Sequence, residues 1–542
     1  MTMRFRWQVL LALASVLFLS PMIAIQPVRA ESIMLPMRDG VKLATDYFLP
    51  EDAQAPFPAI LTRTYYGRAT KYTDAIVQRF AKRGYAYVIQ DVRGRGGSEG
   101  KDMAFDDDGW GERQDGADTV AWIAEQPWCN GKIGTWGGSA LGIVQVFMAP
   151  ATDRVAGQAI SVACSDFYQQ ISYQGGVFRK ALCEDWLKMQ KSEHVLEVWH
   201  AHPTYDAFWE RHNVEPIADR VTAPAVHIGG WWDIFCQGTI NNFVTRQHNG
   251  GPGAKGNQKL IMGAWLHGPK ADPGDLVLKP NFGFDVGKYE DRFLDRYVKG
   301  ETNGIDTEPP VNYYTLGDVA DPGAPGNEWR TAQDWPPFPT VETAYYLHPD
   351  KSLSTDPATG GEPLAFTYDP ANPCPTHGGA ELTLPPGPFD QRELAARPDV
   401  LVFQTAPLDA PIEITGNVKA RLYVSTDAPD TDFTAKFIDI YPDGRQILML
   451  DNIRRLKFWR SYTKADPVTP GTVVPLEIDL WTISLIVNKG HRIGLHVSSS
   501  NYRRFEKNPN TGEDFPGAEL RIAHNNVHMS QDYPSALLLP IR

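Results

Sequence analysis

Short apolar stretches alternate with amphipathic stretches along the first third of the chain. The apolar stretches are short enough for strands, and we predict strands at 59–62, 85–90 and 133–136 with helices at 72–83 and 116–125. Strands that alternate with helices are typical of a parallel sheet covered on both faces. Because the pattern stops near residue 164 and resumes near Thr222, we predict one α/β domain in two parts, residues 31–164 and 216–307.

Two other regions have a different pattern. Residues 165–215 are rich in Trp, His and Glu and show no strand alternation. After about residue 308, short alternating segments such as 418–425 are separated by Pro, Gly and Asp, and Asp443-Gly444 is a hairpin signal. Many such segments predict a β-sandwich over residues 308–542.

The first 30 residues have the pattern of a targeting segment. Arg4 and Arg6 precede the apolar run 9–19, and Val28-Arg29-Ala30 places small residues where a signal peptidase reads them. We predict a signal peptide over residues 1–30 and a secreted or periplasmic protein with no membrane contact after cleavage. A permanent membrane anchor is the alternative, although the apolar run is short for one.

Composition limits the kind of partner and the number of domains. The chain has 542 residues, more than one core usually holds, and a formal net charge of −13. This charge argues against nucleic acid as a partner, because phosphate binding needs concentrated Lys and Arg. The count of five cysteines is odd, so at least one thiol is free; Cys164 and Cys183 are the first pair to consider for a disulfide.

The most informative segment runs from an apolar strand through Gly137 and Gly138 into Ser139 and then into a helical pattern. This order is typical of a nucleophile elbow, a sharp strand-to-helix turn that exposes a serine hydroxyl. The turn also directs the backbone N–H of Ala140 toward an oxyanion at the attacked carbonyl carbon. The spacing is Gly-x-Ser-x-x-Gly, with Gly142 as the last glycine.

Candidate partners for this serine follow it along the chain. One apolar strand ends at Asp233, and a second apolar strand ends at His267. The order Ser, Asp, His is that of α/β-hydrolase triads, whose members lie at the carboxyl ends of neighbouring parallel strands. We therefore predict Ser139, Asp233 and His267 as the catalytic residues.

These motifs resemble the cocaine esterase and X-prolyl dipeptidyl peptidase family of serine hydrolases. The resemblance covers essentially all of the chain after the signal peptide, and it rests on segments 91–100, 115–119, 126–128, 136–139, 442–445, 490–493 and 498–501. It implies an α/β-hydrolase domain with a helical cap inserted at 165–215 and a C-terminal all-β jelly-roll domain. It also implies that Tyr66 donates a hydrogen bond in the oxyanion hole, together with the Ala140 N–H.

Two departures from the family lie beside this tyrosine. Relatives often have proline where this chain has Tyr65, and relatives that bind an α-amino group tend to have a carboxylate just beyond the tyrosine, where this chain has Gly67 and Arg68. The cap acids Glu184, Asp185 and Glu193 are the remaining candidates for binding a substrate ammonium. An arginine near the oxyanion tyrosine would oppose a cationic substrate.

The sequence thus predicts an exported serine hydrolase that cleaves carboxylic esters or amides through a triad and an acyl-enzyme. We expect such an enzyme to need no metal and no organic cofactor. Its partners are a small ester, amide or short peptide substrate, with a homo-oligomer possible. An X-prolyl dipeptidyl aminopeptidase is the first alternative, and a non-catalytic carbohydrate-binding protein is the second.

Overall fold

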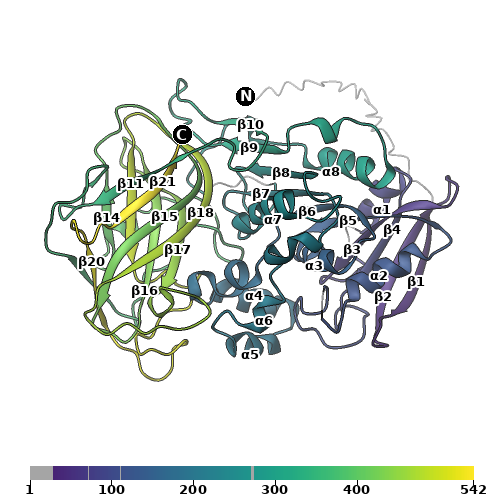
Figure 1. The fold of residues 1–542 in the computed structure, drawn as a ribbon, viewed down its shortest axis with the longest axis horizontal. Helices are drawn as coiled ribbons and strands as arrows, with labels where there is room; N and C mark the ends of the chain where they lie inside the picture. The colour runs from purple at the N-terminus through teal and green to yellow at the C-terminus, as the bar shows by residue number, and fades with distance from the viewer. Residues whose placement is uncertain (1–27, 71–72, 110, 270–273) are drawn as a thin grey trace, which may run out of the picture.

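The computed structural model describes residues 28–70, 73–109, 111–269 and 274–542. Two bodies lie side by side, an α/β body built from the chain up to Ala332 and a β body built from the chain after it (Figure 1). Most of the predicted signal peptide, residues 1–27, lies outside the described residues, and its last three residues open strand β1 (Val28–Pro36). In the described part of the chain, no helix is both long and apolar enough to cross a membrane.

The α/β body is built on a ten-stranded sheet in the order β1-β2-β4-β3-β5-β6-β7-β8-β9-β10. After β1, its strands are β2 (Lys42–Pro50), β3 (Phe57–Thr64), β4 (Ala86–Asp91), β5 (Cys129–Gly138), β6 (Val155–Ser161), β7 (Ala225–Gly230), β8 (Gln258–Gly263), β9 (Val311–Thr315) and β10 (Glu328–Ala332). Pairs from β4 to β9 are parallel, and antiparallel pairs flank them at both edges. Parallel pairing suits the predicted alternation of strands and helices.

Helices cover both faces of this sheet (Figure 1). They are α1 (Thr73–Ala81), α2 (Asp115–Ala124), α3 (Ala140–Met148), α7 (Cys236–Asn249) and α8 (Val286–Leu294). Every residue of β4, β7 and β8 is buried, which explains why the sequence shows continuous apolar runs there instead of alternation. The predicted strands and helices of this region therefore match the observed ones to within a few residues, apart from position 72, which is not described.

A helical cap lies between β6 and β7. It contains a π-helical turn at Tyr168–Ser172 and the helices α4 (Lys180–Gln190), α5 (His194–His200) and α6 (Ala207–Glu210). Its aromatic side chains pack into one apolar cluster with α3, which explains the tryptophan-rich composition of this insertion. The cap reaches the β body as well, because the backbone N–H of Glu506 donates to the carbonyl of Phe178 at 2.8 Å.

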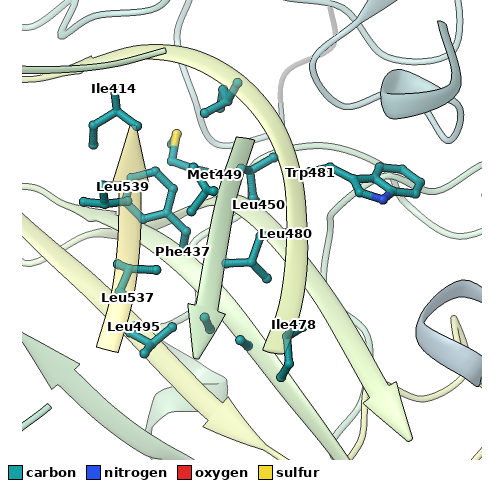
Figure 2. Close-up of a cluster of buried hydrophobic side chains, with 14 of the residues drawn as sticks. Ile414, Phe437, Met449, Leu450, Ile478, Leu480, Trp481, Leu495, Leu537 and Leu539 are labelled. Carbon is teal, nitrogen blue, oxygen red and sulfur yellow. The ribbon is translucent and has the colours of Figure 1, made fainter. Parts of the chain in front are cut away.

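The β body is a sandwich of antiparallel sheets with a dense apolar interior (Figure 2). Its larger sheet contains β11 (Val341–Leu347), β12 (Leu353–Ser354), β13 (Leu364–Tyr368), β15 (Ile412–Thr426), β18 (Val474–Val487), β20 (Ala523–His528) and β21 (Ala536–Ile541). Its smaller sheet contains β14 (Leu401–Gln404), β16 (Asp432–Ile440), β17 (Gln446–Arg455) and β19 (Arg492–Ser498). The predicted hairpin at Asp443-Gly444 joins β16 to β17.

Two expectations need correction. The α/β sheet continues past residue 307, because β9 pairs with β8 and β10 pairs with β9; short edge strands have the same pattern as sandwich strands, so periodicity could not separate them. The pair Cys164 and Cys183 forms no disulfide, and all five cysteines are free and buried. A buried thiol behaves as a small apolar side chain.

Candidate active site

The predicted nucleophile Ser139 lies between β5 and α3 with a strained backbone. Its φ is 57° and its ψ is −128°, a conformation that a residue with a Cβ rarely adopts. The surrounding glycines allow this turn: a Cβ at Gly137 would lie 2.6 Å from the Leu141 Cβ, and one at Gly142 would lie 3.0 Å from the Ala163 Cβ. The glycine at the last position of the motif is therefore needed for close packing of α3 against the segment after β6.

Ser139, His267 and Asp233 form a continuous hydrogen-bonded chain. Nε2 of His267 lies 2.8 Å from Oγ of Ser139, and Nδ1 of His267 lies 2.6 Å from Oδ1 of Asp233. Asp233 is fully buried, whereas the His267 side chain is 15% exposed. The imidazole can therefore exchange a proton with the hydroxyl on one side while the carboxylate holds the other nitrogen.

The sheet brings these three residues together. They follow β5, β7 and β8, whose carboxyl ends lie at one edge. The pairing of β7 with β8 continues into the loops, because the Trp232 N–H donates to the carbonyl of Trp265 at 3.1 Å. Asp233 follows Trp232 by one residue, and His267 follows Trp265 by two residues. The contact between Asp233 and His267 therefore depends on this extended pairing.

The two predicted oxyanion donors are placed differently. Ala140 is buried at the first turn of α3, where backbone N–H groups have no partner within the helix. Tyr66 is 47% exposed, and its hydroxyl lies 3.5 Å from Nε1 of Trp186 on the cap helix α4. The structure therefore places the Ala140 N–H beside Ser139, and it places the Tyr66 hydroxyl at the contact between the α/β body and the cap.

A narrow cavity opens beside Ser139, and its walls are almost entirely apolar. It is lined by Phe105, Ser139, Ala140, Ile143, Phe167, Ile171, Leu182, Cys183, Trp186, Trp199, Ile234, Phe235 and Leu382. Most of these residues belong to the cap or to α3, and none of them carries a charged side chain. Such a cavity favours an uncharged acyl group, because an unpaired charge is costly to bury.

Sequence reasoning missed two parts of this wall. Phe105 follows Ala104, and both have positive φ, 47° at Ala104 and 71° at Phe105. The Phe105 N–H donates to the hydroxyl of Tyr65 at 2.6 Å, which gives a local role to the residue that replaces the family's proline. Leu382 comes from the segment after β13, far along the chain. Neither contact has a signal in sequence spacing.

Most of the charged groups considered for substrate binding are paired, whereas Glu193 is exposed and forms no ion pair with the described residues. Arg68 contacts Asp46 at 2.9 Å and Asp91 at 2.8 Å, so its charge is compensated and the expected repulsion of a cationic substrate is weakened. In the cap, Glu184 contacts Lys180 at 2.8 Å, and Asp185 contacts Arg503 at 2.5 Å. The described cavity wall itself contains no carboxylate for a substrate ammonium. Within the described ranges, no three His, Cys, Asp or Glu side chains gather as a metal site would require.

Comparisons with known proteins agree with this arrangement. The X-Pro dipeptidyl-peptidase (S15 family) profile matches residues 39–194 and 182–269, and the X-Pro dipeptidyl-peptidase C-terminal non-catalytic domain matches residues 303–538. The chain is 31% identical to the cocaine esterase of Rhodococcus sp. (strain MB1 Bresler) over 588 aligned positions, which cover 94% of this chain and 98% of the relative.

Solved structures show the same fold over nearly the whole chain. An aminopeptidase from a marine sediment Thaumarchaeota archaeon superposes with a TM-score of 0.82 at 25% identity, covering 95% of this chain and 97% of that one. An α-amino acid ester hydrolase superposes with a TM-score of 0.77 at 24% identity, covering 97% of this chain and 100% of that one. The chain therefore belongs to the cocaine esterase and X-Pro dipeptidyl-peptidase family and is a serine hydrolase.

Proposed function

We propose that this protein hydrolyses carboxylic esters or amides of uncharged acyl groups through Ser139, His267 and Asp233. The observation that carries the proposal is the hydrogen-bonded chain Ser139–His267–Asp233, with contacts of 2.8 and 2.6 Å, at the mouth of an apolar cavity. The strained backbone of Ser139 supports it further, because strain of this kind concentrates at functional sites.

The reaction follows from these positions. Nε2 of His267 takes the proton from Ser139 while Oγ attacks the acyl carbon, and Asp233 stabilises the imidazolium. The Ala140 N–H and the Tyr66 hydroxyl donate to the oxyanion. The imidazolium then gives its proton to the leaving alcohol or amine, which leaves an acyl-serine. A water molecule, deprotonated by His267, hydrolyses the acyl-serine and restores the enzyme.

The apolar wall supports an ester or acyl-amide substrate over a dipeptide with a free amino group. A pocket that binds an ammonium in a dry site needs a carboxylate. The described cavity wall has none, Glu184 and Asp185 are held in ion pairs, and Glu193 is exposed. The dipeptidyl aminopeptidase remains the second candidate, favoured by the aminopeptidase whose structure superposes on nearly the whole chain. A non-catalytic carbohydrate-binding protein is not supported, because the chain belongs to an enzyme family.

We further propose that residues 1–30 are a signal peptide and that the mature protein is exported. The supporting pattern is the basic start, the apolar run 9–19 and the small residues before position 31. Cleavage after Ala30 would remove the first three residues of β1, a strand at the edge of the described sheet that pairs with β2. N-terminal sequencing of the protein from the culture medium or periplasm tests both the export and the cleavage position.

Parallel assays of the purified protein test the activity. We expect a higher kcat/KM on p-nitrophenyl esters of neutral acyl groups than on Ala-Pro-p-nitroanilide, because the cavity wall is apolar. A fluorophosphonate probe should label Ser139, and Ser139→Ala should abolish labelling and turnover. Arg68→Ala is the matched test of the charge argument, and we expect little change because Asp46 and Asp91 already neutralise this arginine. A preference of more than about tenfold for Ala-Pro-p-nitroanilide would favour the peptidase instead.

A further inference from the structure

Arg179 is a fully buried cation without an ion-pair partner among the described residues. It lies just before α4, and its guanidinium donates to three backbone carbonyls: Nη1 to Gln170 at 2.7 Å and to Ile234 at 3.2 Å, and Nη2 to Ala380 at 3.3 Å. These acceptors belong to the cap, to the loop that carries Asp233 and to the β body. An arginine buried in this way is costly unless a negative charge nearby compensates it.

Two buried carboxylates can supply that negative charge: Glu381, which raises the pKa of Arg179 more, and Asp233. Ile234, whose carbonyl accepts from Arg179, is the next residue along the chain. Asp233 is itself fully buried; its Oδ1 contacts His267, and no donor of the described residues forms a hydrogen bond with its Oδ2. A buried anion with one hydrogen-bonded oxygen and a buried cation with only carbonyl partners thus lie in the same part of the interior.

We propose that Arg179 is a positioning residue for Asp233: it fixes the Asp233 loop through the Ile234 carbonyl, and its charge stabilises the ionised carboxylate behind His267. The proposal rests on the function proposed above, since it assigns Arg179 a role in that same triad. Burial lowers the pKa of Arg179 to about 10, so the side chain is still a cation at neutral pH.

The β body takes part in this arrangement. The Trp481 ring lies 5.9 Å from the guanidinium carbon of Arg179, and Trp481 has a φ of 72° within β18. Figure 2 shows Trp481 pointing away from the sandwich interior, where Leu480 and Ile478 lie. This local twist brings an aromatic side chain to the buried cation, an arrangement that stabilises positive charge. The β body therefore supports the active site as well as its own core.

Further hydrogen bonds hold the Asp233 loop against the β body. Nε1 of Trp232 donates to the carbonyl of Met449 at 3.1 Å, and the thiol of Cys236 lies 3.6 Å from the carbonyl of Thr482. The loop is thus attached to β17 and β18 on both sides of Asp233. Arg179 provides the third attachment, and it is the one that carries charge.

Other ionisable groups also face Arg179, and any test must distinguish their effects from the effect of Asp233. They are Arg504, Glu381 and Cys183. Arg504 contacts Asp451 at 2.6 Å and Glu381 at 3.2 Å, so its charge is compensated. Burial raises the pKa of Glu381 to about 7, which places its titration in the range of the assay. Burial also raises the pKa of the Cys183 thiol, which is neutral there.

The main experiment compares the pH profiles of kcat/KM for wild type, Arg179→Met and Arg179→Lys, with ester hydrolysis as the assay. Removing a positive charge favours the protonated form of neighbouring groups, so in Arg179→Met the acid limb should move to higher pH by about half a unit or more. We expect kcat to fall by about tenfold or more with KM nearly unchanged, because the lost interaction supports the transition state. Arg179→Lys keeps the charge and should restore the acid limb.

Arg246 is the matched control. It is also a buried arginine, and none of the described carboxylates forms an ion pair with it. It lies in the last part of α7, away from the triad, where its Nη1 donates to Oε1 of Gln158 at 2.7 Å. Arg246→Met should lower thermal stability as Arg179→Met does. It should leave the acid limb where the wild type has it, because the shift depends on proximity to Asp233 and not on loss of a buried arginine.

A wild-type acid limb in Arg179→Met, or an equal shift in Arg246→Met, would overturn the proposal while leaving the triad intact, since Ser139→Ala tests the triad separately. The same holds if the shift disappears in a Glu381→Gln background, which would assign it to Glu381. If Arg179→Met does not fold, Trp481→Leu removes the ring beside the guanidinium. We then expect a smaller shift in the same direction, and no shift would count against the proposal.

Discussion

Each body contains a histidine whose Nδ1 contacts a buried aspartate with almost the same geometry. In the α/β body, Nδ1 of His267 lies 2.6 Å from Asp233, and in the β body, Nδ1 of His491 lies 2.8 Å from Asp439. Both carboxylates are buried. The pairs differ in what the second ring nitrogen meets, a serine hydroxyl at 2.8 Å for His267 and a second carboxylate, Asp318, at 3.3 Å for His491.

This difference separates a proton-transfer site from a structural ion cluster. Burial lowers the pKa of His491, but hydrogen bonds and charges from Asp439 and Asp318 outweigh burial and leave the pKa above its ordinary value. Its ring also packs against Tyr441, with centroids 4.3 Å apart. His491 therefore favours the doubly protonated form between two anions, whereas His267 has a neutral hydroxyl to act on. A histidine–aspartate contact alone does not identify a catalytic site.

The largest expected effect comes from breaking the first pair. Asp233→Asn should lower kcat by about 10⁴, as in serine proteases, because the amide favours the wrong imidazole tautomer. Ester turnover by the purified variant measures this. A kcat within tenfold of wild type would remove Asp233 from the proposed triad.

The same substitution in the second pair should act on stability instead. Asp439→Asn leaves a buried histidine with one of its two anions, and loss of one partner from a buried pair costs about 3 kcal/mol of unfolding free energy. Urea unfolding measures the loss, and kcat of the folded variant should stay within about twofold of wild type. A drop in kcat without a drop in stability would contradict the structural role.

The pH dependence of activity is the next test. A general base must be neutral, so kcat/KM should fall about tenfold per pH unit below the midpoint of its acid limb. His491→Gln should leave this midpoint unchanged, since His491 lies in the other body. A flat profile from pH 5 to 9 would contradict a histidine general base, and a midpoint that moves in His491→Gln would assign that role to His491.

The smallest effect is the pH dependence of stability. Because the folded-state pKa of His491 is raised, its stabilising contribution is complete below the unfolded-state value of about 6.5 and is lost as pH rises through the folded-state pKa. The difference in unfolding free energy between wild type and His491→Gln should therefore shrink from pH 6 upward. Denaturant titrations at several pH values measure it, and a difference that grows with pH would have the wrong sign.

Much of the α/β body could be predicted from local sequence. Buried parallel strands are continuous apolar runs, so β4 and β8 stand out, and the amphipathic pattern locates α2. The elbow is also local, because the glycines that permit the turn adjoin Ser139 in sequence. The sequence could not assign the edge strands β9 and β10 to this sheet, because the residue pattern of a short strand does not indicate which strand it pairs with.

The sequence by itself determined the elbow, the order Ser139, Asp233, His267 and the change from an α/β to a β pattern. These depend on neighbours in the chain and on the periods of strands and helices. Only the tertiary structure decided that Leu382 and Phe105 complete one cavity, that Asp46 and Asp91 neutralise Arg68, and that Arg179 lies behind the Asp233 loop. These contacts join segments that are distant in sequence, and burial and ion pairing arise only when packing brings such segments together.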